Sequence, residues 1–157
     1  MISTYDLLKI LHILSATVIF GTGLGTAFHM WMAHLTGDPK IISAAARSTI
    51  RADFLFTTPA VIIQPISGAM LIHITAVDPL APWLVAAYGL YILAALCWLP
   101  VLWLQMKAGR LAREAAERRM PMPPAYGRCM RWWFALGWPA FLAVIGIFWL
   151  MVAKPNL

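Results

Sequence analysis

Four histidines lie within or at the ends of long apolar stretches of the sequence. They are His12, His29, His34 and His73. Ionisable side chains are costly inside a bilayer, so a histidine at membrane depth is a candidate functional residue. Imidazole nitrogens also ligate haem iron and other transition metals. These four residues are therefore the first candidates for chemistry, provided that helices bring them together.

The apolar stretches are long enough to be those helices. Hydrophobic residues make up 62% of the 157 residues and charged residues only 11%, which is unlike a soluble domain. A bilayer core about 30 Å thick needs about 20 mostly apolar residues in a helix. Four stretches qualify, at 7–35, 54–76, 83–106 and 132–153, and none alternates as a barrel strand would. We predict an all-α integral membrane four-helix bundle, with residues 1–157 as a single transmembrane domain.

The linkers between the predicted spans contain clear turn signals. Residues 37–39 (Gly-Asp-Pro) predict a turn, after which residues 41–50 can form a short amphipathic helix. Residues 77–82 predict a tight hairpin. Residues 107–119 continue the third helix until the prolines that follow break it.

Lysine and arginine are distributed unequally between the linkers. The two termini and the second linker hold only Lys9 and Lys154. The first and third linkers hold the other ten, Lys40, Arg47, Arg51, Lys107, Arg110, Arg113, Arg118, Arg119, Arg128 and Arg131. Cytoplasmic loops are enriched in basic residues, so we predict that both termini face away from the cytoplasm. A membrane therefore explains the net charge of +6 better than nucleic acid does.

His12 and His73 are predicted to meet at one depth. With span centres near Phe20 and Ile63, they lie about 12 Å and about 15 Å toward the non-cytoplasmic face at 1.5 Å per residue. Two imidazoles on neighbouring helices of a bundle can ligate haem b through both axial positions. The alternative is that both are interfacial histidines bonded to water or backbone.

His29, Met30 and His34 form a second candidate group at the cytoplasmic end. Met30 and His34 are four residues apart on one helix, and thioether plus imidazole ligands suit Cu(I). The alternative is that methionine merely fills space in an apolar helix. The sequence thus offers a copper site as a competing hypothesis.

Other polar residues receive simpler interpretations. Arg51 and Asp53 are expected to form an interfacial ion pair, and Gln64 a hydrogen bond between helices. Lys9 could pair with Asp6 or contact a haem propionate.

Small and aromatic residues in the spans also carry predictions. Gly21, Gly23 and Gly25 form a stripe that would let another helix, or a flat cofactor, approach closely. The tryptophans near span ends are expected to be interfacial and are Trp83, Trp103, Trp132, Trp133 and Trp149.

Several short runs, in order along all four spans, carry a family resemblance. They are residues 8–13 (LKILHI) before Phe20 and Gly21, residues 58–62 (TPAVI) before Gly68 and Leu71, Trp83 with Leu84, Arg131, Pro139, and residues 152–155 (VAKP). Together they resemble the HemJ-type protoporphyrinogen oxidases. The resemblance implies a bacterial inner-membrane protein that binds haem b, with His12 matching the haem-linked histidine.

One feature of that family is absent. Its third helix carries a lysine shortly after the Trp-Leu pair, whereas residues 85–88 here read VAAY. The chain is more similar to related four-span bacterial proteins of unassigned function. From the histidine pair and the haem binding that the resemblance implies, we expect haem-dependent electron transfer or oxidoreductase chemistry with a quinone or porphyrin-like substrate. The alternative is a non-catalytic membrane subunit or small transporter, for which copper is the candidate metal. In either case lipid or a second copy of the chain would cover the apolar surface.

Overall fold

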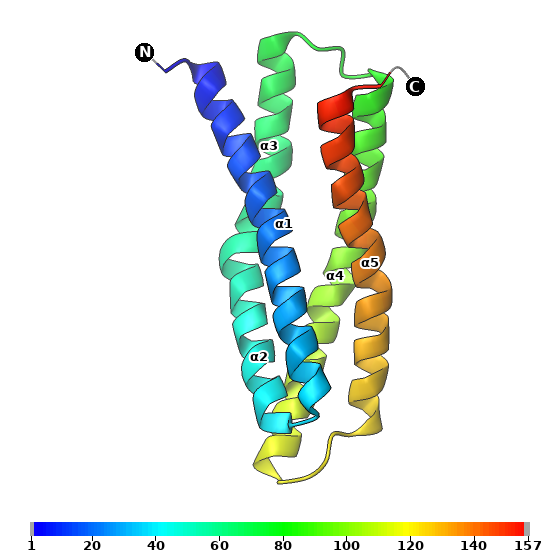
Figure 1. The fold of residues 1–157 in the computed structure, drawn as a ribbon. Helices are drawn as coiled ribbons and strands as arrows, with labels where there is room; N and C mark the ends of the chain where they lie inside the picture. The colour runs from blue at the N-terminus through cyan, green and yellow to red at the C-terminus, as the bar shows by residue number, and fades with distance from the viewer. Residues whose placement is uncertain (1, 156–157) are drawn as a thin grey trace.

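The computed structural model describes residues 2–155, and the regular elements in that range are all helices (Figure 1). In chain order they are α1 (Thr4–Thr36), α2 (Pro39–Ala52), the π-helical turn η1 (Asp53–Thr57), α3 (Thr58–Thr75), α4 (Pro82–Glu117) and α5 (Pro124–Ala153). They make four helical segments that are long and apolar enough to cross a membrane. The prediction of an all-α bundle with four spans is confirmed.

The first helix has well-formed ends. Ser3 caps it by accepting from the Asp6 amide at 3.2 Å, and the Asp6 carboxylate accepts in return from the Ser3 amide at 3.1 Å. Gly37 ends it in the left-handed conformation at φ 65°, which glycine adopts at little cost. The Asp38 side chain then caps α2 by accepting from the Lys40 amide at 2.8 Å. The turn predicted at residues 37–39 is confirmed.

The second span is longer than the sequence indicated. The predicted linker helix is present as α2, but it continues through η1 into α3, so Pro39–Thr75 is one segment of 37 residues. The π-turn ends just before Pro59, whose ring would clash with the carbonyl four residues earlier in a regular α-helix. The extra residue in the π-turn relieves this clash. It also rotates the residues before it about the helix axis, so that their side chains face a different direction.

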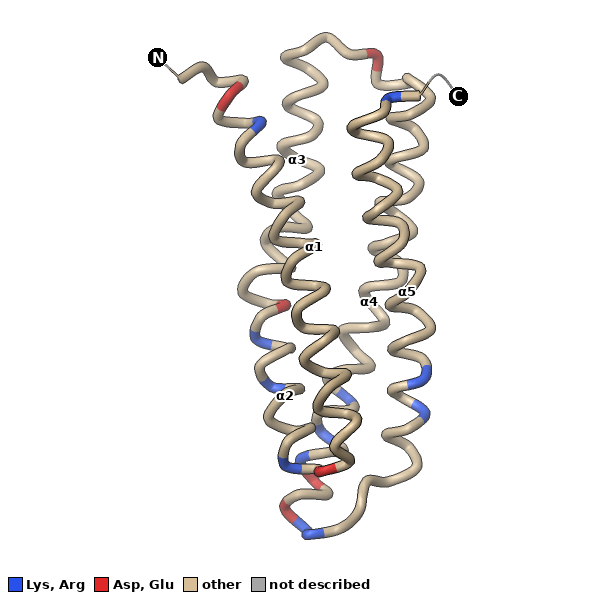
Figure 2. The backbone as a smooth tube through the Cα atoms, viewed as in Figure 1, with Lys and Arg blue, Asp and Glu red and all other residues tan. Residues whose placement is uncertain are grey.

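Both described ends of the chain lie at one end of the bundle, together with the α3–α4 turn (Figure 1). We call this the terminal end. The opposite end carries the α1–α2 turn, the α4–α5 linker and ten of the twelve basic residues (Figure 2), and we call it the basic end. Which end faces the cytoplasm stays a prediction from the charge distribution.

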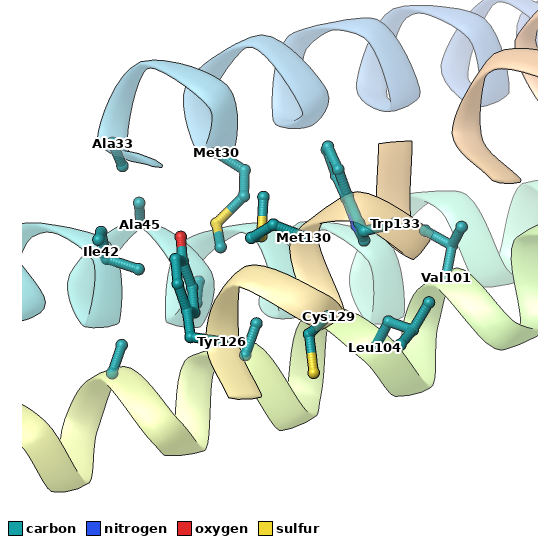
Figure 3. Packing of buried hydrophobic residues seen from close by; sticks show 13 residues of the cluster. Met30, Ala33, Ile42, Ala45, Val101, Leu104, Tyr126, Cys129, Met130 and Trp133 are labelled. Carbon is teal, nitrogen blue, oxygen red and sulfur yellow. The ribbon is translucent and has the colours of Figure 1, made fainter. Parts of the chain in front are cut away.

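The helices pack most tightly toward the basic end. Figure 3 shows a cluster of buried side chains there from α1, α2, α4 and α5, including Met30, Ile42, Tyr126, Met130 and Trp133. Gly109 on α4 allows a very close approach, because a Cβ at that position would lie 2.9 Å from the Ala46 Cβ. This cluster is the hydrophobic core of the bundle.

The helices are less closely joined toward the terminal end. In the described part of the chain, the backbone of α3 lies close to α1 and not to α4, while that of α4 lies close to α5. Side chains bridge the two pairs: Phe20 stacks on Phe141 with ring centroids 5.1 Å apart, and the Tyr91 hydroxyl donates to the Val61 carbonyl at 2.5 Å. The terminal half is thus two helix pairs joined by a few aromatic contacts.

The glycine stripe of α1 does not serve helix packing. Within residues 2–155, a Cβ added at Gly21, Gly23 or Gly25 would meet no atom within 4 Å. No described helix of this chain packs on the stripe, so close approach there by a flat cofactor or by a helix of another molecule stays a prediction.

Candidate functional site

His12 lies on the side of α1 that faces α3. Its Nδ1 is 2.9 Å from the Ser67 hydroxyl, and its Nε2 is 3.1 Å from the Gln64 amide nitrogen. Gln64 also accepts through Oε1 from the Ser15 hydroxyl. The predicted hydrogen bond between helices at Gln64 is confirmed, and Ser15, Ser67 and Gln64 together make a polar cluster around His12.

The orientation of the Gln64 amide decides which ring nitrogen of His12 carries the proton. With Gln64 Oε1 turned toward Ser15 and its amide nitrogen turned toward His12, Nε2 accepts and is unprotonated. Nδ1 then carries the proton and donates to Ser67, whose hydroxyl donates onward to the Ile63 carbonyl at 2.8 Å. This tautomer, with Nδ1–H bonded to oxygen and a lone pair on Nε2, is the form in which histidine ligates a metal.

Gly68 makes room for the imidazole. A Cβ at Gly68 would lie 3.2 Å from His12 Cε1, which is tighter than ordinary contact. The ring therefore lies directly on the backbone of α3. No flat group can fit between α1 and α3 at this level without separating them.

The structure does not bring His73 to His12. His73 is exposed and lies five residues beyond Gly68 on α3, or about 8 Å farther along the helix axis. The predicted arrangement of one haem held between these two histidines does not fit the observed packing, because the span centres inferred from hydropathy misjudged the offset of the two helices.

Lys9 lies at the terminal end of the same helix as His12. Its Nζ is 5.5 Å from the centroid of the Tyr5 ring, while Asp6 bonds to Ser3. The expected ion pair between Asp6 and Lys9 is not formed. The only ion pair among residues 2–155 joins Arg113 to Glu117 at 3.8 Å on an exposed face.

The three residues of the copper hypothesis point in different directions. His29 bonds to Ser48 on α2 at 3.1 Å, whereas His34 bonds to Tyr126 on α5 at 3.0 Å. Met30 is fully buried in the core at 0% exposure. Because the three side chains contact three different surroundings, the copper hypothesis gains no support from the geometry.

A second polar cluster was not anticipated from the sequence. Asp53, in the π-turn, is buried and accepts from the Thr57 hydroxyl at 3.0 Å and from the Gln105 amide at 2.5 Å. Trp133 donates through Nε1 to Gln105 Oε1 at 3.3 Å. The expected pairing of Asp53 with Arg51 is wrong, since Arg51 is exposed and Asp53 points inward.

The prediction that Trp133 lies at the membrane interface is wrong. Trp133 is only 6% exposed and sits inside the bundle, not at the lipid interface. The sequence did contain a signal for the contact between Asp53 and Gln105. Asp53 lies near the start of one span and Gln105 near the end of the next, and antiparallel packing places these two positions at the same level. That juxtaposition could have been read from the spans alone.

The fold and its charge distribution define a helical integral membrane protein with four spans. A family model described as "Predicted integral membrane protein (DUF2269)" matches residues 6–155, and the chain belongs to this family. No curated protein and no solved structure matches the chain. The prediction of a four-span membrane protein of unassigned function is confirmed, while the resemblance to HemJ-type enzymes stays a prediction.

Proposed function

We propose that this protein binds haem b in the terminal half of the bundle, with His12 Nε2 as the iron ligand. The observation that carries the proposal is what faces the two ring nitrogens of His12. Nδ1 lies against the Ser67 hydroxyl and Nε2 against the Gln64 amide nitrogen, an arrangement in which Nδ1–H donates to Ser67 and Nε2 keeps a lone pair. Ligating histidines usually donate their other N–H to an oxygen in this way.

The neighbours of His12 fix the position of its ring. Ser67 is hydrogen-bonded to Nδ1, and Gly68, which has no side chain, leaves room for the ring against α3. Iron at Nε2 would take the place of the Gln64 hydrogen bond there and would require α1 and α3 to separate at this level, while Gln64 could keep its second bond, to Ser15. Lys9, about one helical turn nearer the terminal end than His12, is suited to contact a propionate.

Haem b would supply one-electron exchange. The exchange partner we propose is a quinone or a porphyrin-like substrate, because both are apolar enough to reach the bundle from the lipid. Only one protein ligand is assigned to the iron, since His73 does not lie at the level of His12.

The test is an optical spectrum of the protein purified in detergent after expression with added haem precursor. Wild type should show a Soret band and a reduced-minus-oxidised difference spectrum of b type. His12→Ala should lose it, while His29→Ala, which removes a histidine bonded to Ser48 at the other end of α1, should keep it. Colourless wild-type protein would overturn the proposal, and metal analysis of that sample would then distinguish a copper-handling protein from a metal-free subunit.

His73→Ala gives a separate readout. We expect its spectrum to match wild type. A changed spectrum would support ligation of haem by both His12 and His73. That arrangement would require α3 to shift along α1 by about five residues, or about 8 Å.

A further inference from the structure

The inference concerns Asp53, which plays no part in the proposed haem site. Asp53 is 4% exposed in a helix that crosses the membrane, and a buried charge without a partner is costly. Among residues 2–155 no cation lies within ion-pair distance of it. Its two carboxyl oxygens contact neutral donors, Thr57 and Gln105.

Trp133 fixes the orientation of Gln105. An indole N–H can only donate, so the Gln105 atom that faces it must be the amide oxygen. The Gln105 NH₂ group therefore faces Asp53 Oδ2, which must accept. Oδ2 consequently cannot be the oxygen that carries a proton.

Thr57 leaves the other oxygen free to carry one. A hydroxyl can donate or accept. When Asp53 is ionised, the Thr57 hydroxyl donates to Oδ1; when Oδ1 is protonated, it donates to the Thr57 hydroxyl, 3.0 Å away. Every hydrogen bond around the carboxyl group survives in both states.

Basic residues lie next to the cluster on the side of the basic end. Each of its three side chains is two residues from the nearest basic residue in the sequence. The pairs are Asp53 with Arg51, Gln105 with Lys107, and Trp133 with Arg131. Thr49, one turn before Asp53 toward the basic end, is 1% exposed and its hydroxyl has no hydrogen-bond partner in the described structure.

No neighbouring charged group neutralises Asp53. The charged or titratable side chains nearest to it in sequence on the surrounding helices are engaged elsewhere or exposed. They are His29 on α1, bonded to Ser48; Arg51 on α2, exposed; Lys107 on α4, over the Trp103 ring at 4.9 Å; and Arg131 on α5, exposed. The titratable residue of α3, His73, lies at the opposite end.

We propose that Asp53 is a proton-binding site that takes up and releases a proton at Oδ1, exchanging with the basic end of the bundle past the Thr49 hydroxyl. Trp133 and Gln105 are positioning residues that keep Oδ2 as an acceptor. The π-turn turns the carboxyl group inward, and π-turns recur at functional sites. A four-span protein with such a site can couple a reaction or a transported solute to proton movement.

Infrared difference spectroscopy between high and low pH tests this. Wild-type protein should gain a carboxylic acid C=O band on acidification, and Asp53→Asn should lose it. Asp78→Asn, which changes an exposed aspartate of the α3–α4 turn, should keep it. If Asp53→Asn fails to fold, ¹³C-aspartate labelling of the triple variant Asp6→Asn, Asp38→Asn, Asp78→Asn assigns the band, because Asp53 is then the one aspartate left in the sequence.

The position of the proton has its own test. The C=O oxygen of the protonated acid should be Oδ2, bonded to Gln105. Gln105→Leu removes that hydrogen bond and should move the band to higher frequency, whereas Thr57→Ser keeps a hydroxyl and should leave it in place.

Three results would overturn the proposal: no aspartate band at any pH, a band that does not change with pH, or a band removed by Na⁺ at constant pH, which would indicate a cation site. The measurement needs no haem. Its failure is therefore distinguishable from failure of the haem proposal.

Discussion

The two polar clusters of this bundle differ in what surrounds them. The Asp53 cluster is buried beside the tightly packed core, whereas the His12 cluster lies where α1 and α3 are separated from α4 and α5 by a few aromatic contacts. Thr57 and Gln105 occupy both carboxyl oxygens of Asp53 inside the packed region. His12 is also held closely, against α3, but the α1–α3 pair is only loosely joined to the α4–α5 pair beside it. The comparison indicates a rigid basic half and an adaptable terminal half.

The largest expected effect of a single change is in the basic half. Trp133→Ala should destabilise the protein by about 3–5 kcal/mol, because it leaves a large cavity in the core and removes the donor to Gln105. The measurement is unfolding in detergent titrated with a denaturing surfactant. Trp138→Ala is the matched control, since Trp138 is 62% exposed. Equal losses for the two variants would contradict a rigid basic half.

A pair of glycine substitutions sharpens the same comparison. Gly109→Ala places a methyl group 2.9 Å from the Ala46 Cβ, and such overpacking costs about 1–3 kcal/mol. Gly21→Ala meets nothing within 4 Å and should be neutral or stabilising by up to about 1 kcal/mol, since alanine favours helix. Thermal unfolding of both variants in one detergent checks the difference. A destabilised Gly21→Ala would show that another molecule covers that face.

A small but informative loss of stability is expected at Gly68. Gly68→Ala pushes on the His12 ring through a contact of 3.2 Å, and a few tenths of an ångström of movement on α1 relieves it. We expect a stability loss of about 1 kcal/mol or less, together with an altered haem spectrum. An unchanged spectrum in the presence of haem would mean that His12 is not held against α3 when iron is bound.

Sequence predicted those features that depend on one helix at a time. The length of the apolar stretches predicted the four spans, and residues 37–39 predicted the first turn. Gln64, a polar residue in mid-span, predicted a hydrogen bond between helices. The offset between α1 and α3 was not predictable. His12 faces Gly68 and not His73 because α2, η1 and α3 form one segment whose register hydropathy does not define.

The direction in which a side chain faces was also beyond the sequence. Trp132 and Trp133 are neighbours at the end of one span, yet the first is exposed and the second buried. Only the placement of α4 beside α5 decides which of them contacts Gln105. Likewise, Asp53 and Arg51 look like an ion pair in sequence, but the π-turn directs the aspartate inward.

The most direct test of the central claim is the reduced-minus-oxidised spectrum of wild type, His12→Ala and His29→Ala, purified side by side with haem supplied. The account predicts a b-type spectrum in wild type and His29→Ala and its loss in His12→Ala. A haem-free wild type, or a His12→Ala variant that keeps the full spectrum, would contradict it.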